Sequence, residues 1–349
     1  MTTPPRLGPR KPRRLGIALA LTVGAGLALT ACGSEDDGDD KAEDKASAIE
    51  RAGEVDSEVN GDTVTITDNQ DRKVEVPVKP ETVVVMDWSA IRTLNDFGVP
   101  VDAVPQAAGS LPEDLSAYAG DDVPKVGDVF EPDYEAIEAM DPDLVIVAGR
   151  SGSPEVVAEF ERFAPAVIDM SVTPDDPADT FSTAEERVLQ LADIFDVREE
   201  AESTMDGLAT QMQDLQDEIT GADETAMFVQ VSDGTIGAYG PGSRFGTIFT
   251  DFGYQSTSAP LDEEGSHGEE ISQEFFVEYN PDVLFVLDRA KAIGEDQTPA
   301  LDVLDNELID SVTAAKDDRI SEVDGFAWYL AGNAPSSIQQ MIDDVKASR

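Results

Sequence analysis

A segment that occurs twice constrains the fold of this chain more than any other feature. Residues 135–150 (EAIEAMDPDLVIVAGR) align without a gap with residues 274–289 (EFFVEYNPDVLFVLDR). Each copy predicts a helix, a Pro-Asp turn, a buried strand and then an arginine. A solenoid needs about three or more stacked units, so two copies do not suffice. The repeat therefore predicts two similar α/β lobes within the 349 residues.

The remaining patterns extend this prediction. Residues 63–67 and 73–76 alternate at period two around a polar turn, which indicates an antiparallel hairpin. From Val83 onward, short apolar strands alternate with helices, as in a parallel sheet covered on both faces.

Helical patterns at 185–195 and 199–219 separate the two copies of the repeat, and the second helix would be about 30 Å long at about 1.5 Å per residue. We expect an α/β fold with two Rossmann-like lobes joined by a long rigid helix. The expected boundaries are 58–178 for the N-terminal lobe, 179–222 for the connecting helices and 223–349 for the C-terminal lobe.

The first residues are typical of an export signal. Four basic residues between Arg10 and Arg14 precede an uncharged apolar run from Leu15 to Ala31. The run ends in Leu-Thr-Ala-Cys, which resembles the bacterial lipobox, so residues 1–31 are predicted to be a lipoprotein signal peptide and Cys32 the lipidated residue. The pattern leaves the export route open between Sec and twin-arginine. Residues 32–57 are acidic and polar, which predicts a disordered tether.

The overall charge limits the partners. A formal net charge of -49 at pH 7 excludes nucleic acid as a plausible partner. We expect most of the acidic residues to form a solvated surface.

Three arginines form a candidate ligand site. Arg150 and Arg289 follow equivalent strands of the two repeat copies, and ligands of open α/β sheets collect beyond the carboxyl ends of the strands. Arg244 lies in a glycine-rich loop, residues 240–246, whose spacing fits neither a phosphate loop nor a dinucleotide fingerprint. The set suggests an anionic ligand. The alternative is that each arginine pairs with a neighbouring acid.

His267 and Tyr329 are candidate iron ligands, because imidazole and tyrosinate both bind ferric iron. His267 is the only histidine, which argues against the multi-histidine sites of zinc binders and leaves an incidental role open. A single imidazole and the lack of a Gly-x-Ser-x-Gly sequence argue against a hydrolase.

From Val83 to Val345 the chain resembles the iron-chelate periplasmic binding proteins, specifically the branch that binds catecholate siderophores for bacterial ABC importers. The resemblance is carried by residues 130–135, 142–146, 242–246, 267–268, 280–289 and 328–330. It implies a lipoprotein outside the cytoplasm with the class III fold of that family. The implied ligand is a ferric siderophore, with no intrinsic cofactor.

The resemblance also implies residue roles. Arg150, Arg244 and Arg289 would surround the anionic complex, and His267 and Tyr329 would complete the iron shell of a four-donor siderophore. Glu135 and Glu274 would dock on the permease, which works with its ATPase. The alternative is that each is a first-turn glutamate that interacts favourably with the helix dipole.

Several expectations remain open at this stage. Trp88 either lines the cleft or packs in the core. Heme and cobalamin receptors share the same architecture and are alternative assignments. We expect a monomer.

Overall fold

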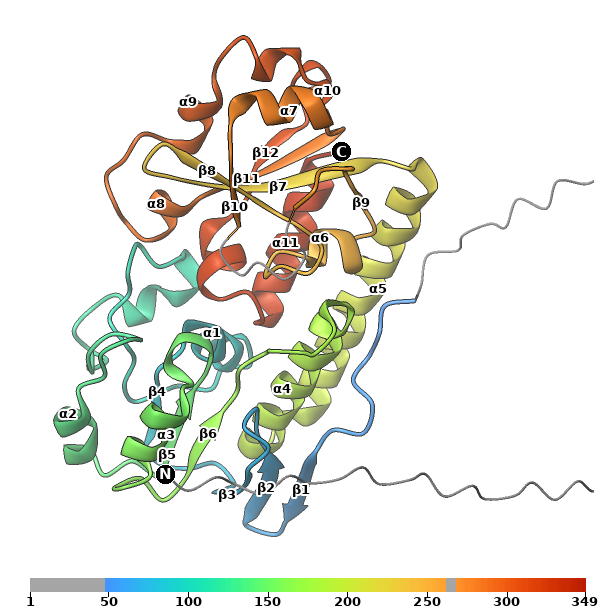
Figure 1. The fold of residues 1–349 in the computed structure, drawn as a ribbon. Helices are drawn as coiled ribbons and strands as arrows, with labels where there is room; N and C mark the ends of the chain where they lie inside the picture. Colours follow the sequence, from blue (N-terminus) through green and yellow to red (C-terminus); the bar gives the residue numbers. More distant parts are fainter. Residues whose placement is uncertain (1–47, 262–267) are drawn as a thin grey trace, which may run out of the picture. The chain divides into compact units, whose positions relative to one another are not determined.

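The computed structural model describes residues 48–261 and 268–349, which form two α/β lobes and a pair of long helices (Figure 1). None of the helices in these residues is long and apolar enough to cross a membrane. The two-lobed α/β architecture predicted from the repeat is confirmed.

The N-terminal lobe is built on a parallel sheet of order β4-β5-β6, next to an antiparallel sheet of order β1-β2-β3. The strands are β1 (Ser57–Asn60), β2 (Thr63–Thr67), β3 (Lys73–Pro77), β4 (Val83–Val85), β5 (Leu144–Val147) and β6 (Val167–Asp169). The helices of this lobe are α1 (Trp88–Asp96), α2 (Tyr134–Ala139) and α3 (Pro154–Phe160). β2 and β3 are the predicted hairpin, and they enclose the loop of residues 68–72, called the hairpin loop below.

The C-terminal lobe has a mixed sheet of order β10-β8-β7-β11-β12, with β9 paired to β7. Its strands are β7 (Thr225–Ser232), β8 (Thr235–Tyr239), β9 (Gln255–Ser256), β10 (Glu269–Ile271), β11 (Val283–Asp288) and β12 (Ile320–Glu322). Its helices are α6 (Thr247–Thr250), α7 (Gln273–Tyr279), α8 (Arg289–Ala292), α9 (Ala300–Leu304), α10 (Thr313–Lys316) and α11 (Pro335–Ala347).

The two repeat copies adopt the predicted structure, with α2 before β5 in one lobe and α7 before β11 in the other. The aspartate of each Pro-Asp turn explains the motif. Asp143 Oδ2 accepts the Thr82 N–H at 2.9 Å, and Asp282 Oδ2 accepts the Thr225 N–H at 2.9 Å. Each carboxylate thereby ties the start of the repeat strand to the neighbouring strand, β4 or β7.

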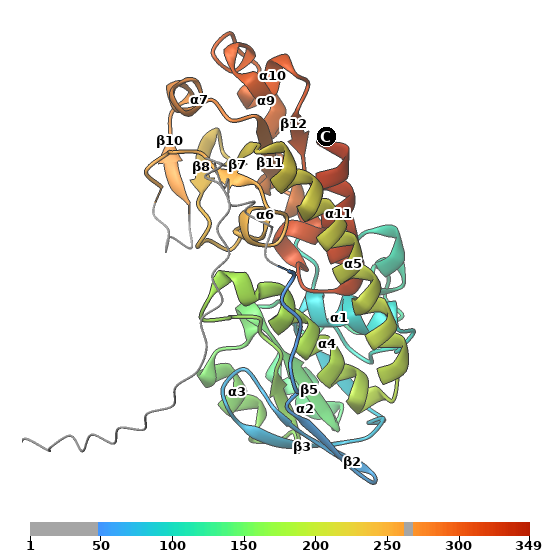
Figure 2. The same ribbon diagram turned by 90° about the vertical axis from the view of Figure 1, so that its right-hand side faces the viewer.

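The connecting helices are α4 (Thr180–Phe195) and α5 (Arg198–Ala222), close to the predicted segments. Figure 2 shows α5 running alongside both lobes. α4 contributes to two cores, because Val188 packs in the core of the C-terminal lobe and Leu191 in that of the N-terminal lobe. The helices therefore form a wall that both lobes share.

The prediction of a disordered tether up to residue 57 is wrong for its last residues. The Ile49 N–H donates to Gln213 Oε1 at 2.8 Å, and Arg51 forms ion pairs with Glu185 on α4 and Asp206 on α5. Ile49 and Val55 also pack against the core. Specific partners on the long helices hold this polar segment, and composition alone does not reveal such partners.

Candidate functional site

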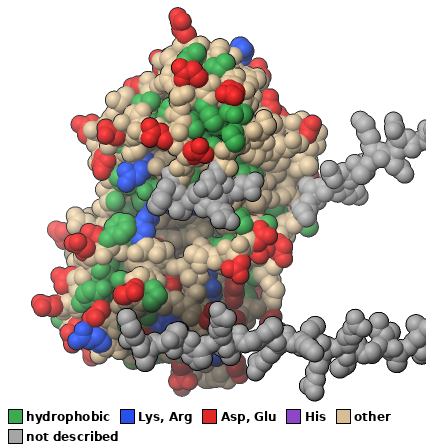
Figure 3. Space-filling model, in the orientation of Figure 1, with side chains coloured by type: hydrophobic (Ala, Val, Ile, Leu, Met, Phe, Trp, Pro, Cys, Tyr) green, Lys and Arg blue, Asp and Glu red, His purple; other side chains and the backbone are tan. Residues whose placement is uncertain are grey.

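A cleft of about 700 Å³ is lined by residues of both lobes. Asp87 and Arg150 border it from the N-terminal lobe, and Arg244 and Tyr329 border it from the C-terminal lobe. In Figure 3, some Lys and Arg side chains (blue) lie where the lobes meet and others lie at the top and at the lower left of the view, whereas Asp and Glu side chains (red) are spread over the outer surface. Part of the cleft wall is apolar and comes from the long helices and α11, with Val188, Met212 and Met341 among its residues.

Arg150 reaches across from the N-terminal lobe to Tyr329. It lies on a tight turn, Gly149–Ser151, that begins two residues after the last residue of β5. Its Nη2 donates to the Tyr329 carbonyl at 3.2 Å, and its guanidinium lies 4.8 Å from the centre of the Tyr329 ring. The predicted position after the buried strand is therefore what brings this arginine to the cleft.

Arg244 approaches the same tyrosine from the loop before α6. Its Nη2 donates to the Tyr329 carbonyl at 3.1 Å, and its guanidinium lies 4.6 Å from the ring centre. The loop is tight, because a Cβ on Gly246 would lie 2.0 Å from the Pro241 carbonyl oxygen. Glycine is therefore required at position 246 to present Arg244 in this way.

Arg289, the first residue of α8, holds the phenol end of Tyr329. Its Nε donates to Tyr329 Oη at 3.1 Å and its Nη1 to Ser232 Oγ at 3.3 Å. Arg289 is not among the residues that line the cleft, so it reaches the site through the Tyr329 hydroxyl. All three predicted arginines thus converge on one side chain.

The convergence is electrostatically unusual. Among residues 48–261 and 268–349, no carboxylate forms an ion pair with Arg150, Arg244 or Arg289. Burial raises the pKa of Asp87, and the charge of Arg150 works against this rise, so Asp87 is a nearby acid although it forms no ion pair with Arg150. In the described part of the chain, no ion pair supports the alternative that neighbouring acids neutralise the three arginines. Burial within the cleft walls, and then the charge of Arg150, lower the pKa of the Arg244 guanidinium. An anion in the cleft would relieve this repulsion.

The phenol of Tyr329 responds to the same charges. Burial by itself raises the pKa of Tyr329, but the hydrogen bond from Arg289 and the charges of the three arginines outweigh burial and hold this pKa below its ordinary value. Tyr329 is therefore easier to deprotonate than a free tyrosine, which favours it as a ligand for a hard cation such as ferric iron.

The interpretation of Trp88 as a residue of the cleft is wrong. Its side chain is 5% exposed and packs edge-on against Phe326, with ring centres 6.3 Å apart. The preceding residue, Asp87, faces the cleft instead and caps α1 by accepting the N–H groups of Ser89 and Ala90. A large apolar ring at the start of a helix gains more by packing in the core than by facing solvent.

Asp251 is a cleft residue that the sequence did not reveal. It is 3% exposed, and its Oδ2 accepts the Thr247 hydroxyl at 2.5 Å and the Thr250 hydroxyl at 3.3 Å. Burial raises the pKa of this carboxyl to about 7. Residue type alone does not predict this burial, because an aspartate is most often exposed.

The remaining predicted residues divide into two groups. Cys32 and His267 lie outside the described residues. Glu135 and Glu274 are exposed in the first turns of α2 and α7, the equivalent helices of the two lobes. In the described part of the chain, no group of three or more His, Cys, Asp or Glu side chains is arranged to hold a metal ion.

Comparison with known proteins agrees with this geometry. Residues 83–325 match the family described as periplasmic binding protein, and the chain belongs to that family. It is a binding protein rather than an enzyme. The petrobactin-binding protein YclQ of Bacillus subtilis (strain 168) is 30% identical over 296 residues, which cover 83% of this chain and 89% of that protein.

Two solved structures extend the comparison. The periplasmic catecholate-siderophore binding protein VctP from Vibrio cholerae has a TM-score of 0.74 and 30% identity, covering 82% of this chain and 99% of its own. The siderophore-binding protein BauB was solved with a complex of two molecules of acinetobactin and ferric iron. It has a TM-score of 0.73 and 26% identity, and the match covers 82% of this chain and 98% of the BauB chain. Both support the predicted class III fold.

Proposed function

We propose that this protein captures a ferric siderophore of the catecholate type outside the cytoplasm and delivers it to an ABC permease. The observation that carries the proposal is the convergence of Arg150, Arg244 and Arg289 on Tyr329 in the cleft between the lobes. A ferric catecholate carries net negative charge and aromatic rings, which suit guanidinium groups and the apolar wall. The names of the relatives support the same class of ligand.

An optical titration of the purified protein tests this function. We expect added ferric catecholate to bind one to one and to give a visible charge-transfer band that moves on binding. A Soret band of protein-bound heme, with no response to ferric catecholate, would identify a heme receptor of the same fold. Failure to bind any of several ferric siderophores would overturn the proposal.

We further propose that Tyr329 and His267 complete the iron shell when the siderophore offers only four donors. Tyr329→Phe should then weaken binding of a four-donor ferric catecholate about tenfold, while a six-donor complex, which leaves no open iron position, serves as the matched control. Equal weakening for both complexes would show that the Tyr329 hydroxyl acts only through its hydrogen bond with Arg289.

The lowered pKa of Tyr329 gives this ligation a pH dependence. Iron can take the phenolate only after the proton has left, so affinity for the four-donor complex should rise with pH until the free protein's own Tyr329 ionises. Tyr329→Phe should flatten the profile.

The lipid anchor is part of the proposal and rests on the lipobox that ends at Cys32. Cys32→Ser should move the protein from the membrane fraction to the soluble fraction of its native host. Equal release of the native protein and the variant would contradict lipidation at Cys32.

We propose that Glu135 and Glu274 contact the permease, with the binding protein acting as a monomer. Both are exposed at equivalent places, and an exposed apolar residue is close in sequence to each one: Phe130 is 68% exposed and Val277 is 44% exposed. Charge reversal at both glutamates should reduce siderophore uptake without changing the affinity of the purified protein. Unchanged uptake would remove these residues from the interface.

A further inference from the structure

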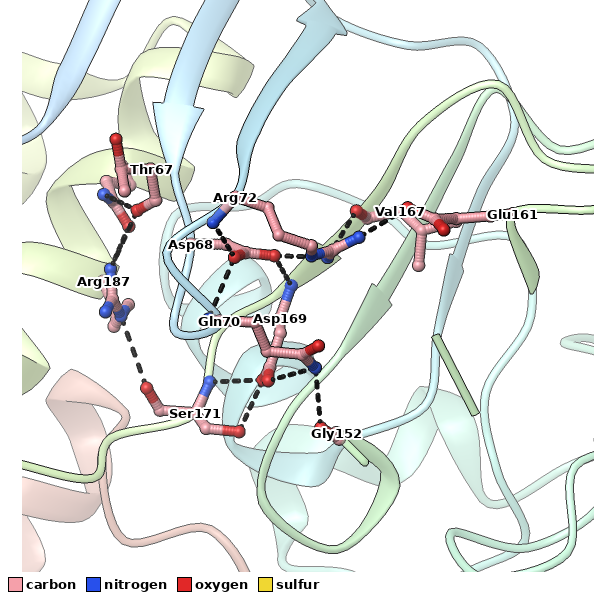
Figure 4. Close-up of polar contacts among 11 residues, drawn as sticks. Thr67, Asp68, Gln70, Arg72, Gly152, Glu161, Val167, Asp169, Ser171 and Arg187 are labelled. Carbon is pink, nitrogen blue, oxygen red and sulfur yellow. Dashed lines mark hydrogen bonds and ion pairs between the residues drawn. The ribbon is translucent and has the colours of Figure 1, made fainter. Parts of the chain in front are cut away.

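The turn that carries Arg150 is held by side chains from two other segments of the N-terminal lobe. We call residues 149–152 the Arg150 turn. The Gly149 N–H donates to Ser171 Oγ at 2.8 Å, and the Gly152 carbonyl accepts the side-chain amide of Gln70 at 2.9 Å. Ser171 follows β6, and Gln70 belongs to the hairpin loop (Figure 4). The turn is thus fixed at both ends by groups distant in sequence.

Asp169 joins these two contacts. The last residue of β6, it is 1% exposed. Its Oδ1 accepts the Ser171 N–H at 3.0 Å and the Ser171 hydroxyl at 2.5 Å, and its Oδ2 accepts the Gln70 amide at 3.0 Å. A hydroxyl has one proton, so donation to Asp169 leaves its lone pairs for the Gly149 N–H. The carboxylate therefore orients the groups that hold the turn.

The hairpin loop is itself fixed to β6. Asp68 is 2% exposed, and its Oδ2 accepts the Asp169 N–H at 3.1 Å. Its Oδ1 accepts the Gln70 N–H at 3.0 Å, and Arg72 donates to the Val167 carbonyl at 3.1 Å. Figure 4 shows these side chains between the hairpin and β6. Gln70 is therefore presented to the Arg150 turn by a rigid support.

The space around the turn is equally restricted. A Cβ on Gly152 would lie 2.7 Å from Asp169 Oδ1 and 2.8 Å from Ser171 Oγ. The turn thus packs directly on the polar group that orients it. Asp169, Ser171 and Gln70 each make more than one of these hydrogen bonds, which restricts the turn to one position, and rigid placement of a binding group lowers the entropic cost of binding.

We propose that Gln70, Asp169 and Ser171 are positioning residues that hold Arg150 in the cleft, so that the N-terminal hairpin contributes to ligand affinity. None of them needs to touch the ligand for this effect. The inference rests on the proposed function, in which Arg150 contacts an anionic chelate. A purely structural role for the network would stabilise the lobe without any specific coupling to Arg150.

A double-mutant cycle distinguishes the two roles. Gln70→Ala removes the contact to Gly152, and Gln70 does not line the cleft. We expect it to weaken binding of ferric iron complexed with 2,3-dihydroxybenzoate about fivefold. In an Arg150→Ala background, Gln70→Ala should not weaken binding further. In an Arg289→Ala background, it should weaken binding by the same factor as in the native protein. Equal losses in both backgrounds would overturn the proposal.

Asp71→Asn is the matched control. Asp71 lies in the same hairpin loop, its side chain is exposed, and it is not among the residues that line the cleft. We expect native affinity for this variant. If Gln70→Ala fails to fold, Gln70→Leu, which is similar in size but lacks the amide donor, replaces it in the same cycle.

A ligand-free measurement separates this inference from the proposed function. If the native protein binds no ferric catecholate, the proposed function fails, but Arg150 still lies 4.8 Å from the centre of the Tyr329 ring. The NMR chemical shifts of the Tyr329 ring, recorded without ligand, should then change in Gln70→Ala in the same direction as in Arg150→Ala, with no change in Asp71→Asn. Unchanged Tyr329 ring shifts in Gln70→Ala would overturn the positioning role.

Discussion

Arg244→Ala should bind a ferric catecholate about 30-fold to 100-fold more weakly than the native protein, the scale of one or two lost charge-assisted hydrogen bonds. Arg244 borders the cleft. The charge of Arg150 lowers the pKa of the Arg244 guanidinium, and Tyr329 raises it. Its removal takes away both positive charge and a planar donor. Calorimetric titration measures the loss.

Two further variants sharpen this experiment. Arg244→Lys keeps the charge but not the fork of donors, so we expect an intermediate affinity. Arg162→Ala removes an exposed arginine that pairs with Glu159 on the outside of the same protein, and it should bind as the native protein does. Native affinity in Arg244→Ala would exclude this arginine from the ligand site.

The folded protein itself should tolerate the loss of Arg244. The repulsion from Arg150 and the cost of desolvating the guanidinium both disappear in Arg244→Ala. We therefore expect a melting temperature equal to or above that of the native protein. This result would assign the weaker binding to the site and not to unfolding.

Asp251→Asn should stabilise the protein at pH 8 and leave its stability at pH 4 nearly unchanged. The folded-state pKa of Asp251 is about 7, against an ordinary value of 3.8. Between these values the folded state holds a proton that the unfolded state has lost, so the free energy of unfolding falls as pH rises from about 4 to about 7. Because Asn cannot ionise, the free energy of unfolding of Asp251→Asn should not fall for this reason over the same pH range.

The size of the effect follows from the same pKa values. Holding the pKa near 7 instead of 3.8 corresponds to about 4 kcal/mol, which is an upper bound because the site can relax or admit water. Urea denaturation at a series of pH values measures it. Asp121→Asn, at an exposed loop position, is the control for the loss of one negative charge. A gain that is independent of pH would contradict the buried-acid explanation.

The sequence alone predicted the elements whose signals are local. The alternation at 63–67 and 73–76 gave β2 and β3, and the apolar runs gave β4, β5 and β11. The Pro-Asp repeat predicted two equivalent lobes. The structure gives the physical reason for the repeat, since the turn aspartates make the same contact in both lobes. Helical periodicity likewise placed α4 and α5 to within a few residues.

Two of the three arginines were proposed for a similar reason, and Arg244 was proposed from its glycine-rich loop. Arg150 and Arg289 follow repeat strands, and the carboxyl ends of parallel strands are where ligands collect in open sheets. The sequence did not predict that both arginines contact Tyr329. Arg150 and Tyr329 are separated by 179 positions, and only the packing of the two lobes brings them within hydrogen-bond distance.

Only the tertiary structure decided the direction of individual side chains. Trp88 and Asp87 are adjacent, yet one is in the core and the other at the cleft. Asp251 is buried and Asp169 organises the Arg150 turn, although both are aspartates in a chain with 73 acidic residues. Composition and periodicity report average burial along a segment. The environment of a single polar group depends on distant segments that pack against it, and local sequence does not encode which segments these are.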